Sequence, residues 1–288
     1  MCVASLTALI QCSIGSVSIG ADYPRDGAVV GNRQTCRTRA DDSLPEIARR
    51  YDIGFNAIVA ANPGVDPFVP GRRRKIAIPS QWILPDAPTR DGIVINIAEM
   101  RLYLFPHNGS RTVATFPVGI GDEGKDTPVG TFRIIAKIKD PPWNVPESIR
   151  KEKPYLPAVV PPGPDNPMGS RALRLSNPAI LIHGTDRPWG IGTRNSHGCI
   201  RLYEEDIALL FGRVGPGMRV TIVNQPVKAA ARGGRVVVQV HDYGDGRNLY
   251  REALRLLDAK GLAGRVDLAK VRTAARARSG LLVDVSRQ

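Results

Sequence analysis

The stretch AILIHGTDRPWGIGTRNSHGCIRL, residues 179–202, decides how the centre of this 288-residue chain folds. Its first four residues form an apolar run typical of a buried strand, and His183 follows at the point where that strand ends. Cys199 comes sixteen residues later, after a loop that contains several glycines. Because glycine permits tight returns of the backbone, we expect this loop to bring the cysteine back beside the strand-end histidine.

Three side chains in this stretch, His183, His197 and Cys199, are compatible with three kinds of site. Cysteine is a strong nucleophile only as the thiolate, and either imidazole can remove its proton, while Gly198 can direct backbone N–H groups toward an oxyanion. The same three residues can bind zinc, although no second cysteine or carboxylate stands at ligand spacing. In the third alternative, Cys199 is a buried apolar residue and both histidines only stabilise the loop.

The segments around this stretch predict a region over residues 91–225 that consists mostly of short strands. We expect a helix in EEDIALLF, residues 204–211. The expected strands lie in GIVINI, RLYLF, TVATFPVGIG, DTPVGTFRIIAKI, RALRL, AILIH and MRVTIV. Regularly spaced short strands indicate a sandwich or barrel, so the fold class is mainly β, or α+β overall.

Residues 35–80 predict a small βααβ unit. Ser43 and Glu46 form a capping box for a first helix, Asn56 is expected to cap a second, and KIAIP is a closing strand. The unit resembles the LysM module, which implies binding of glycans that contain N-acetylglucosamine; a structural copy without sugar binding is the alternative. The matching residues are Leu44, Ile47, Ala48, Tyr51, Asn62, Gly71, Ile78 and Pro79. Residues 81–90 are expected to form a linker.

Both ends of the chain carry distinct signals. Residues 1–21 contain no charge and include a short apolar stretch, which predicts a secretory signal peptide. Its removal would leave Cys36 and Cys199 as the cysteines of the mature chain. The C-terminal segment, residues 226–288, is expected to form the strand RVVVQV and two helices, over residues 247–259 and 265–278.

The formal charge is +13, and residues 227–288 hold thirteen Lys and Arg against six Asp and Glu, about half of that excess. Nucleic acid is the first partner to consider, but the two tyrosines of this segment do not alternate with basic residues as a stacking surface requires. An anionic cell wall or membrane surface fits the charge at least as well, and a merely solvated basic face is the simplest explanation.

The motifs HGT, residues 183–185, and SHGCIRL, residues 196–202, resemble the catalytic domain of the L,D-transpeptidases, the YkuD or ErfK/YbiS/YcfS/YnhG family. VGIGDEGKDTPVGTF, residues 118–132, and VVPPGPDNPMG, residues 159–169, support the match. The resemblance implies a β-sandwich-like domain that acts on peptidoglycan in the periplasm of a Gram-negative cell. It also implies that no cofactor or metal is needed and that carbapenems acylate the cysteine.

The resemblance implies a division of roles within the site. Cys199 is the nucleophile, His183 is the general base and later the acid, and the backbone carbonyl of Gly184 orients the His183 ring. The remaining expected roles are a supporting hydrogen bond for His197, an oxyanion N–H for Gly198, and substrate binding for Ser196, Trp189 and Arg201, the last near stem-peptide carboxylates.

The implied reaction is a ping-pong acyl transfer. The thiolate attacks the carbonyl at the L-centre of diaminopimelate in a tetrapeptide stem, and D-alanine leaves. The acceptor is the amine of another diaminopimelate, the C-terminal lysine of a lipoprotein, or water, which would make the protein an L,D-carboxypeptidase. The competing hypotheses are a non-catalytic protein that binds peptidoglycan and, less favoured, a nucleic-acid binder. After removal of the signal peptide, the sequence predicts no integral membrane protein.

Overall fold

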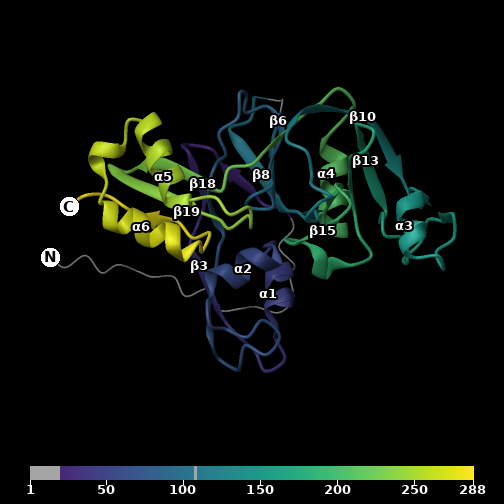
Figure 1. The fold of residues 1–288 in the computed structure, drawn as a ribbon, viewed down its shortest axis with the longest axis horizontal. Helices are drawn as coiled ribbons and strands as arrows, with labels where there is room; N and C mark the ends of the chain where they lie inside the picture. Colours follow the sequence, from purple (N-terminus) through teal and green to yellow (C-terminus); the bar gives the residue numbers. More distant parts are fainter. Residues whose placement is uncertain (1–19, 107–108) are drawn as a thin grey trace.

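The computed structural model describes residues 20–106 and 109–288 (Figure 1). The predicted signal peptide, residues 1–21, lies outside the described residues except for its last two. Among the helices of the described ranges, none is both long enough and apolar enough to span a bilayer.

A nine-stranded sheet forms the centre of the molecule, in the order β1-β8-β7-β6-β17-β10-β13-β14-β16. β6 pairs with β17, and β14 with β16, in parallel; the other neighbours are antiparallel. The strands are β1 (Asp22–Pro24), β6 (Gly92–Asn96), β7 (Arg101–Phe105), β8 (Thr112–Pro117), β10 (Gly130–Lys139), β13 (Arg171–Leu175), β14 (Leu181–His183), β16 (Ile200–Arg201) and β17 (Arg219–Val223). The expected mainly β class is confirmed.

The long strand β10 connects the two parts of this sheet. Its first half pairs with β17 and its second half with β13, with an irregular register between Ile134 and Ala136. Such irregularities bend a strand, and one continuous apolar core contains side chains from both parts of the sheet. Helix α4 (Glu204–Arg213), which the sequence predicts, packs into the same core through Ile207 and Leu210.

Smaller elements lie around the sheet. The predicted strand TVATFPVGIG is divided into β8 and β9 (Ile120–Gly121), and β9 pairs in parallel with β15 (Arg194–Ser196). The segment between β10 and β13 contains β11 (Trp143–Asn144), α3 (Glu147–Glu152) and β12 (Val159–Val160), and it extends to the right of the sheet in Figure 1.

The N-terminal unit has the predicted βααβ order. It consists of β3 (Gln34–Arg37), α1 (Leu44–Arg50), α2 (Phe55–Ala61) and β4 (Lys75–Ile78), and β3 pairs with β4. The capping box of Ser43 and Glu46 is present at α1. The prediction that Asn56 caps α2 is wrong: Gly54 occupies the cap position, and the Asn56 amide contacts Met100 Sδ at 3.9 Å. Asn56 stands two residues beyond the cap position, already inside the helix, where its side chain does not satisfy the first N–H groups.

This βααβ unit shares its core with the central sheet. Alternate residues of β6 and β7 point to opposite faces, so Val94 and Tyr103 pack with Ile47 and Trp82 and not with the catalytic core. The predicted linker, residues 81–90, is wrong at its start. There β5 (Gln81–Ile83) is largely buried and pairs with β2 (Val29–Gly31), because its apolar residues complete the shared core.

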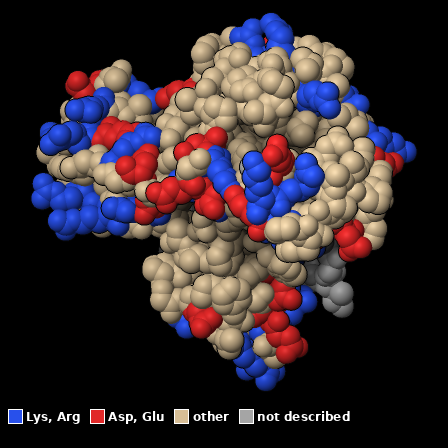
Figure 2. All heavy atoms as spheres, turned by 45° about the vertical axis from the view of Figure 1, so that its right-hand side comes forward, with Lys and Arg blue, Asp and Glu red and all other residues tan. Residues whose placement is uncertain are grey.

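The C-terminal segment forms a compact unit with an apolar core of its own. Both predicted helices are present, as α5 (Leu249–Ala259) and α6 (Leu268–Ala277), followed in Figure 1 by the chain end at the left. Besides β19 (Arg235–Val240), which the sequence predicts, β18 (Val227–Arg232) and β20 (Val283–Asp284) complete a small sheet. Figure 2 shows basic side chains on this end of the molecule, interspersed with acidic ones.

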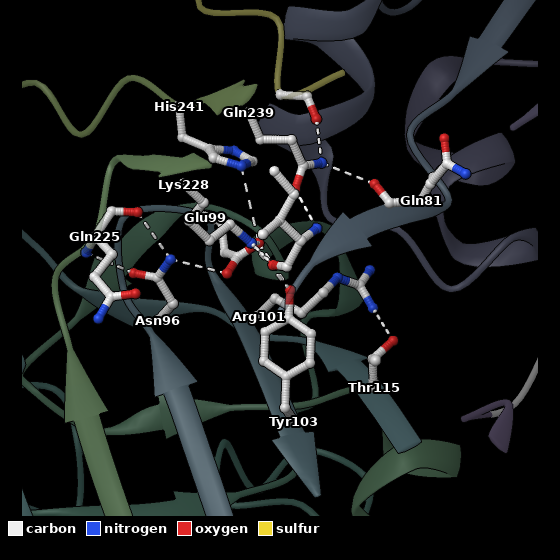
Figure 3. A network of polar contacts seen from close by, with 12 residues as sticks. Gln81, Asn96, Glu99, Arg101, Tyr103, Thr115, Gln225, Lys228, Gln239 and His241 are labelled. Atoms are coloured by element: carbon white, nitrogen blue, oxygen red, sulfur yellow. Dashed lines mark hydrogen bonds and ion pairs between the residues drawn. The ribbon is translucent and has the colours of Figure 1, made fainter. Parts of the chain in front are cut away.

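A buried polar network joins the C-terminal unit to the central sheet (Figure 3). Lys228 Nζ lies 2.6 Å from Glu99 Oε2, which also accepts a hydrogen bond from the Tyr103 hydroxyl at 2.9 Å. Gln239 accepts from the backbone N–H of Ile83 at 2.7 Å. Burial opposes ionisation of Glu99, but Lys228 and His241 outweigh it and hold the pKa of Glu99 below its ordinary value. This network orients the C-terminal unit on β5 and the sheet.

Candidate active site

Cys199 and His183 lie on two neighbouring parallel strands. The register of β14 and β16 pairs Ile182 with Ile200 and His183 with Arg201. Ile182 and Ile200 point into the apolar core, so His183 and Arg201, one position farther along, point to the opposite face. Cys199 precedes Arg201 by two residues and shares that face. The glycine loop therefore returns the chain so that Cys199, directly before β16, lies next to β14, the strand that His183 ends.

His183 is buried and held in one orientation. Its Nδ1 lies 2.7 Å from the backbone carbonyl oxygen of Gly184. A carbonyl only accepts hydrogen bonds, so Nδ1 carries the proton and Nε2 has a lone pair. Burial and, second, the charge of Arg201 lower the pKa of His183 to about 4. The imidazole is therefore neutral near pH 7 and able to accept a proton.

The Cys199 thiol is partly exposed and lies against the start of β14. Its sulfur faces the carbonyl of Ala179 at 3.9 Å. Burial raises the pKa of Cys199, while the Leu181 N–H and the charge of Arg201 oppose that rise. The Cys199 thiol and the His183 imidazole are thus both neutral near pH 7, so attack by the sulfur requires transfer of the thiol proton to a base.

Arg201 is the cation closest in sequence and register to this pair. One of its terminal nitrogens donates to the Asn195 side chain at 3.2 Å. Its Nε is buried and has no hydrogen-bond partner among the described residues. A buried Nε is not open to a ligand, so the expected contact of Arg201 with a substrate carboxylate stays a prediction that depends on its terminal nitrogens.

His197 points away from Cys199 and His183. Its Nε2 lies 2.6 Å from Lys125 Nζ and 4.0 Å from Glu152 Oε2, and Lys125 itself pairs with Glu152 at 3.2 Å. Burial and Lys125 lower the pKa of His197. The structure therefore places the second histidine on the rim of the site, against α3, and not at the expected hydrogen bond within it.

Ser196 and Gly198 shape the turn that presents the thiol. The Ser196 hydroxyl donates to the Cys199 carbonyl at 2.6 Å and accepts from the Gly198 N–H at 3.2 Å. Gly198 has a φ of +100°, a conformation that favours glycine, and its carbonyl accepts from Thr127 at 3.0 Å. Since the Gly198 N–H is already engaged by Ser196, it is not free in this conformation for the expected oxyanion role.

The third expected substrate contact, Trp189, lies in the loop between β14 and β15. It belongs to a short 3₁₀ turn, Pro188–Gly190, and 61% of its surface is exposed. An exposed indole is a large apolar surface that a ligand can cover.

Among the described residues, no group of three or more His, Cys, Asp or Glu side chains lies close enough together to hold a metal ion.

Glu204 is a residue of this site that the sequence did not reveal. Its Oε1 accepts from the Thr185 N–H at 2.7 Å and its Oε2 from the Ser170 N–H at 3.0 Å. A Cβ atom on Gly184 would lie 1.8 Å from Oε1, so a larger residue there would displace the Glu204 carboxylate. Acidic residues are common at helix N-termini, so Glu204 at the start of α4 gave no signal of a role near His183.

Comparison with known proteins identifies relatives over most of the chain. A family model described as the L,D-transpeptidase catalytic domain, YkuD, matches residues 90–222. The chain is 48% identical over 208 residues to the probable L,D-transpeptidase YcfS of Escherichia coli K12, covering 69% of this chain and 64% of YcfS. It is 43% identical over 241 residues to the probable L,D-transpeptidase YbiS of the same strain, covering 80% of this chain and 77% of YbiS.

A third relative extends over nearly the whole chain. The probable L,D-transpeptidase ErfK/SrfK of Escherichia coli K12 is 37% identical over 296 aligned residues, covering 97% of this chain and 94% of that protein. Among solved structures, the catalytic domain of an L,D-transpeptidase from E. faecium acylated by ertapenem is 18% identical. Its TM-score is 0.37, and the match covers 47% of this chain and 99% of that domain.

Proposed function

Because the chain belongs to the L,D-transpeptidase family, we propose that it forms a thioester between Cys199 and a peptidoglycan stem peptide and transfers the acyl group to an amine. The observation that supports this proposal is the parallel pairing of β14 with β16, since His183 ends β14 and Cys199 directly precedes β16. The predicted family and the predicted enzyme class are confirmed by the relatives; the site roles and the LysM assignment stay predictions.

Because the Cys199 thiol and the His183 imidazole are both neutral, the first half-reaction includes a proton transfer between them. The Cys199 sulfur attacks the carbonyl carbon at the L-centre of diaminopimelate while its proton passes to His183 Nε2. The tetrahedral intermediate then collapses: the bond to D-alanine breaks, the leaving amine takes the proton from His183, and a thioester remains. The Gly184 carbonyl holds the Nδ1 proton throughout, as the carboxylate does in other triads.

The second half-reaction reverses these roles. An incoming amine attacks the thioester carbonyl, His183 accepts a proton from that amine, and the Cys199 thiolate leaves and is protonated again. In this proposal the Arg201 guanidinium binds a stem-peptide carboxylate, and the exposed Trp189 covers the apolar part of the peptide. A diaminopimelate amine gives a 3→3 cross-link, and a lipoprotein lysine gives an anchored lipoprotein.

We assign the remaining parts of the chain to placing the enzyme at its substrate. The βααβ unit, residues 35–80, would bind the glycan, and the basic segment, residues 226–288, would be attracted to the anionic wall. Residues 1–21 would direct export to the periplasm. Sedimentation of the full chain with purified peptidoglycan tests these assignments: binding should fall with added N-acetylglucosamine oligomers and with rising salt.

The test of the catalytic proposal is incubation with disaccharide-tetrapeptide, with and without a lipoprotein C-terminal peptide, followed by mass spectrometry. The expected products are free D-alanine and a dimer 3→3 linked or a peptide conjugate, and Cys199→Ala should abolish all of them. Conversion of tetrapeptide to tripeptide alone would favour the L,D-carboxypeptidase. Absence of D-alanine release, together with no ertapenem adduct on Cys199, would favour the non-catalytic peptidoglycan-binding protein.

A further inference from the structure

The Glu204 carboxylate is directed at backbone N–H groups beside the catalytic histidine. It is the first residue of α4, and within the described part of the chain it forms no ion pair. Both of its oxygens accept from the backbone: Oε1 from Thr185 and Oε2 from Ser170. These two N–H groups belong to the segments that follow β14 and precede β13. One carboxylate therefore holds two segments together next to His183.

The Thr185 N–H belongs to the same peptide group as the Gly184 carbonyl. In a trans peptide these two groups point in opposite directions, and no cis peptide bond occurs in the described chain. Glu204 therefore binds one side of this peptide at 2.7 Å, and His183 Nδ1 binds the other side at 2.7 Å. A carboxylate, a peptide and an imidazole form one continuous line of hydrogen bonds.

Two glycines make this approach possible. A Cβ atom on Gly184 would lie 1.8 Å from Glu204 Oε1, and one on Gly169 would lie 1.9 Å from the same atom. Gly169 also has a φ of +64°, which favours glycine. The backbone of Met168, the residue before it, contacts the His183 ring. Both backbone segments that face the imidazole thus lie in direct contact with Glu204.

We propose that Glu204 is a positioning residue for His183, acting through the Gly184–Thr185 peptide. Hydrogen bonds in a chain polarise one another, so a carboxylate on the N–H makes the carbonyl a stronger acceptor for the Nδ1 proton. The line stabilises the imidazolium that forms when the Cys199 proton reaches Nε2. This inference rests on the proposed roles of Cys199 and His183. It assigns a carboxylate to a triad whose third member is otherwise a neutral carbonyl.

The test compares Glu204→Gln with Glu205→Gln, the same substitution one residue along the helix. Glu205 pairs with Arg49 at 2.9 Å and has no contact with the site, so it controls for charge and helix stability. With tetrapeptide donor, we expect Glu204→Gln to lower kcat roughly tenfold or more while KM changes little. The loss should be smaller than the ~10⁴-fold loss seen when a carboxylate directly on the imidazole is neutralised.

A second readout does not depend on transpeptidation. Iodoacetamide alkylation of Cys199, followed by peptide mass spectrometry between pH 5 and 10, reports thiolate formation. Losing support for the imidazolium should raise the apparent thiol pKa by about one unit and slow alkylation at pH 7 roughly tenfold. Arg201, the charged group that affects both Cys199 and His183, is unchanged in both variants. Glu204→Asp should recover part of the effect.

Each outcome either supports or overturns the positioning role of Glu204. Equal kcat and equal alkylation profiles for Glu204→Gln and Glu205→Gln overturn the positioning role. If the wild type releases no D-alanine but its alkylation profile shifts in Glu204→Gln, the proposed function fails and the positioning role stands. Thermal unfolding of both variants verifies that each is folded at the assay temperature.

Discussion

Two buried histidines lie in two different regions of the molecule. Burial lowers the pKa of both to about 4: His183 at the active-site edge, and His241 at the junction with the C-terminal unit. His183 is bonded to the Gly184 carbonyl and shares a face with a partly exposed thiol. His241 faces the ion pair of Glu99 and Lys228, 3.8 Å from Glu99 Oε2 (Figure 3). A lowered pKa therefore does not identify a catalytic histidine; a reactive neighbour does.

The largest expected difference between these regions is in turnover. His183→Asn removes the group that accepts the thiol proton, so D-alanine release should fall roughly 10²–10⁴-fold. The rate is measured with tetrapeptide donor at pH 7, and circular dichroism verifies folding. A loss below threefold would show that another group takes the proton and would remove the distinction between the two histidines.

At the junction with the C-terminal unit, we expect a substitution to change the free energy of unfolding and not the turnover. Lys228→Met leaves the buried Glu99 without its cation and should cost about 3–5 kcal/mol in the free energy of unfolding. Urea denaturation provides the measurement, and the double variant with Glu99→Gln should recover part of the loss. A cost below about 1 kcal/mol would mean that the Asn96 and Tyr103 hydrogen bonds suffice for Glu99.

A carboxyl pair at the other junction, between the βααβ unit and α4, sharpens the comparison. Burial raises the pKa of Asp206 to about 7, and it also raises the pKa of the neighbouring Asp52. The folded chain retains a proton that the unfolded chain loses near pH 4, so stability should fall as pH rises from about 4 to about 7.

Asp206→Asn should reduce this decline, whose slope is at most about 1.4 kcal/mol per pH unit for each retained proton, while Asp52 keeps the part that its own burial causes. Urea midpoints of the variant and the wild type at pH 5, 6, 7 and 8 test it. Parallel curves for Asp206→Asn and the wild type would contradict a shared buried proton.

The smallest effect at neutral pH is expected for His241→Gln. His241 is neutral when folded but protonated below about pH 6.5 when unfolded, so it should cost stability as pH falls from about 6.5 to about 4. The variant should unfold within about 1 kcal/mol of the wild type at pH 7 but be the more stable one at pH 5. D-alanine release at pH 7 should stay unchanged, and a tenfold loss would mean that this histidine also serves catalysis.

Local patterns in the sequence were sufficient for most of the fold. Apolar alternation located β6, β7 and β13, and the capping box of Ser43 and Glu46 located the start of α1. β18 was missed because its alanines carry little strand preference, and its pairing with β19 decides its conformation. The linker was misjudged because the burial of Trp82 depends on an outer sheet face that lies elsewhere in the chain.

The residues of the site also divide into those that the sequence predicts and those that only the tertiary structure reveals. By its residue types, the motif at residues 183–202 left a nucleophile, a zinc site and a structural loop open; its resemblance to the L,D-transpeptidases predicts Cys199 as the nucleophile and His183 as its base. Only the folded chain turned His197 outward to Lys125 and brought the Glu204 carboxylate behind the Gly184 peptide. Strand preference and motif spacing are local properties of the backbone. The packing of segments far apart in the chain decides which side chains lie together on paired strands. It also decides which of them approach the backbone where a glycine leaves room.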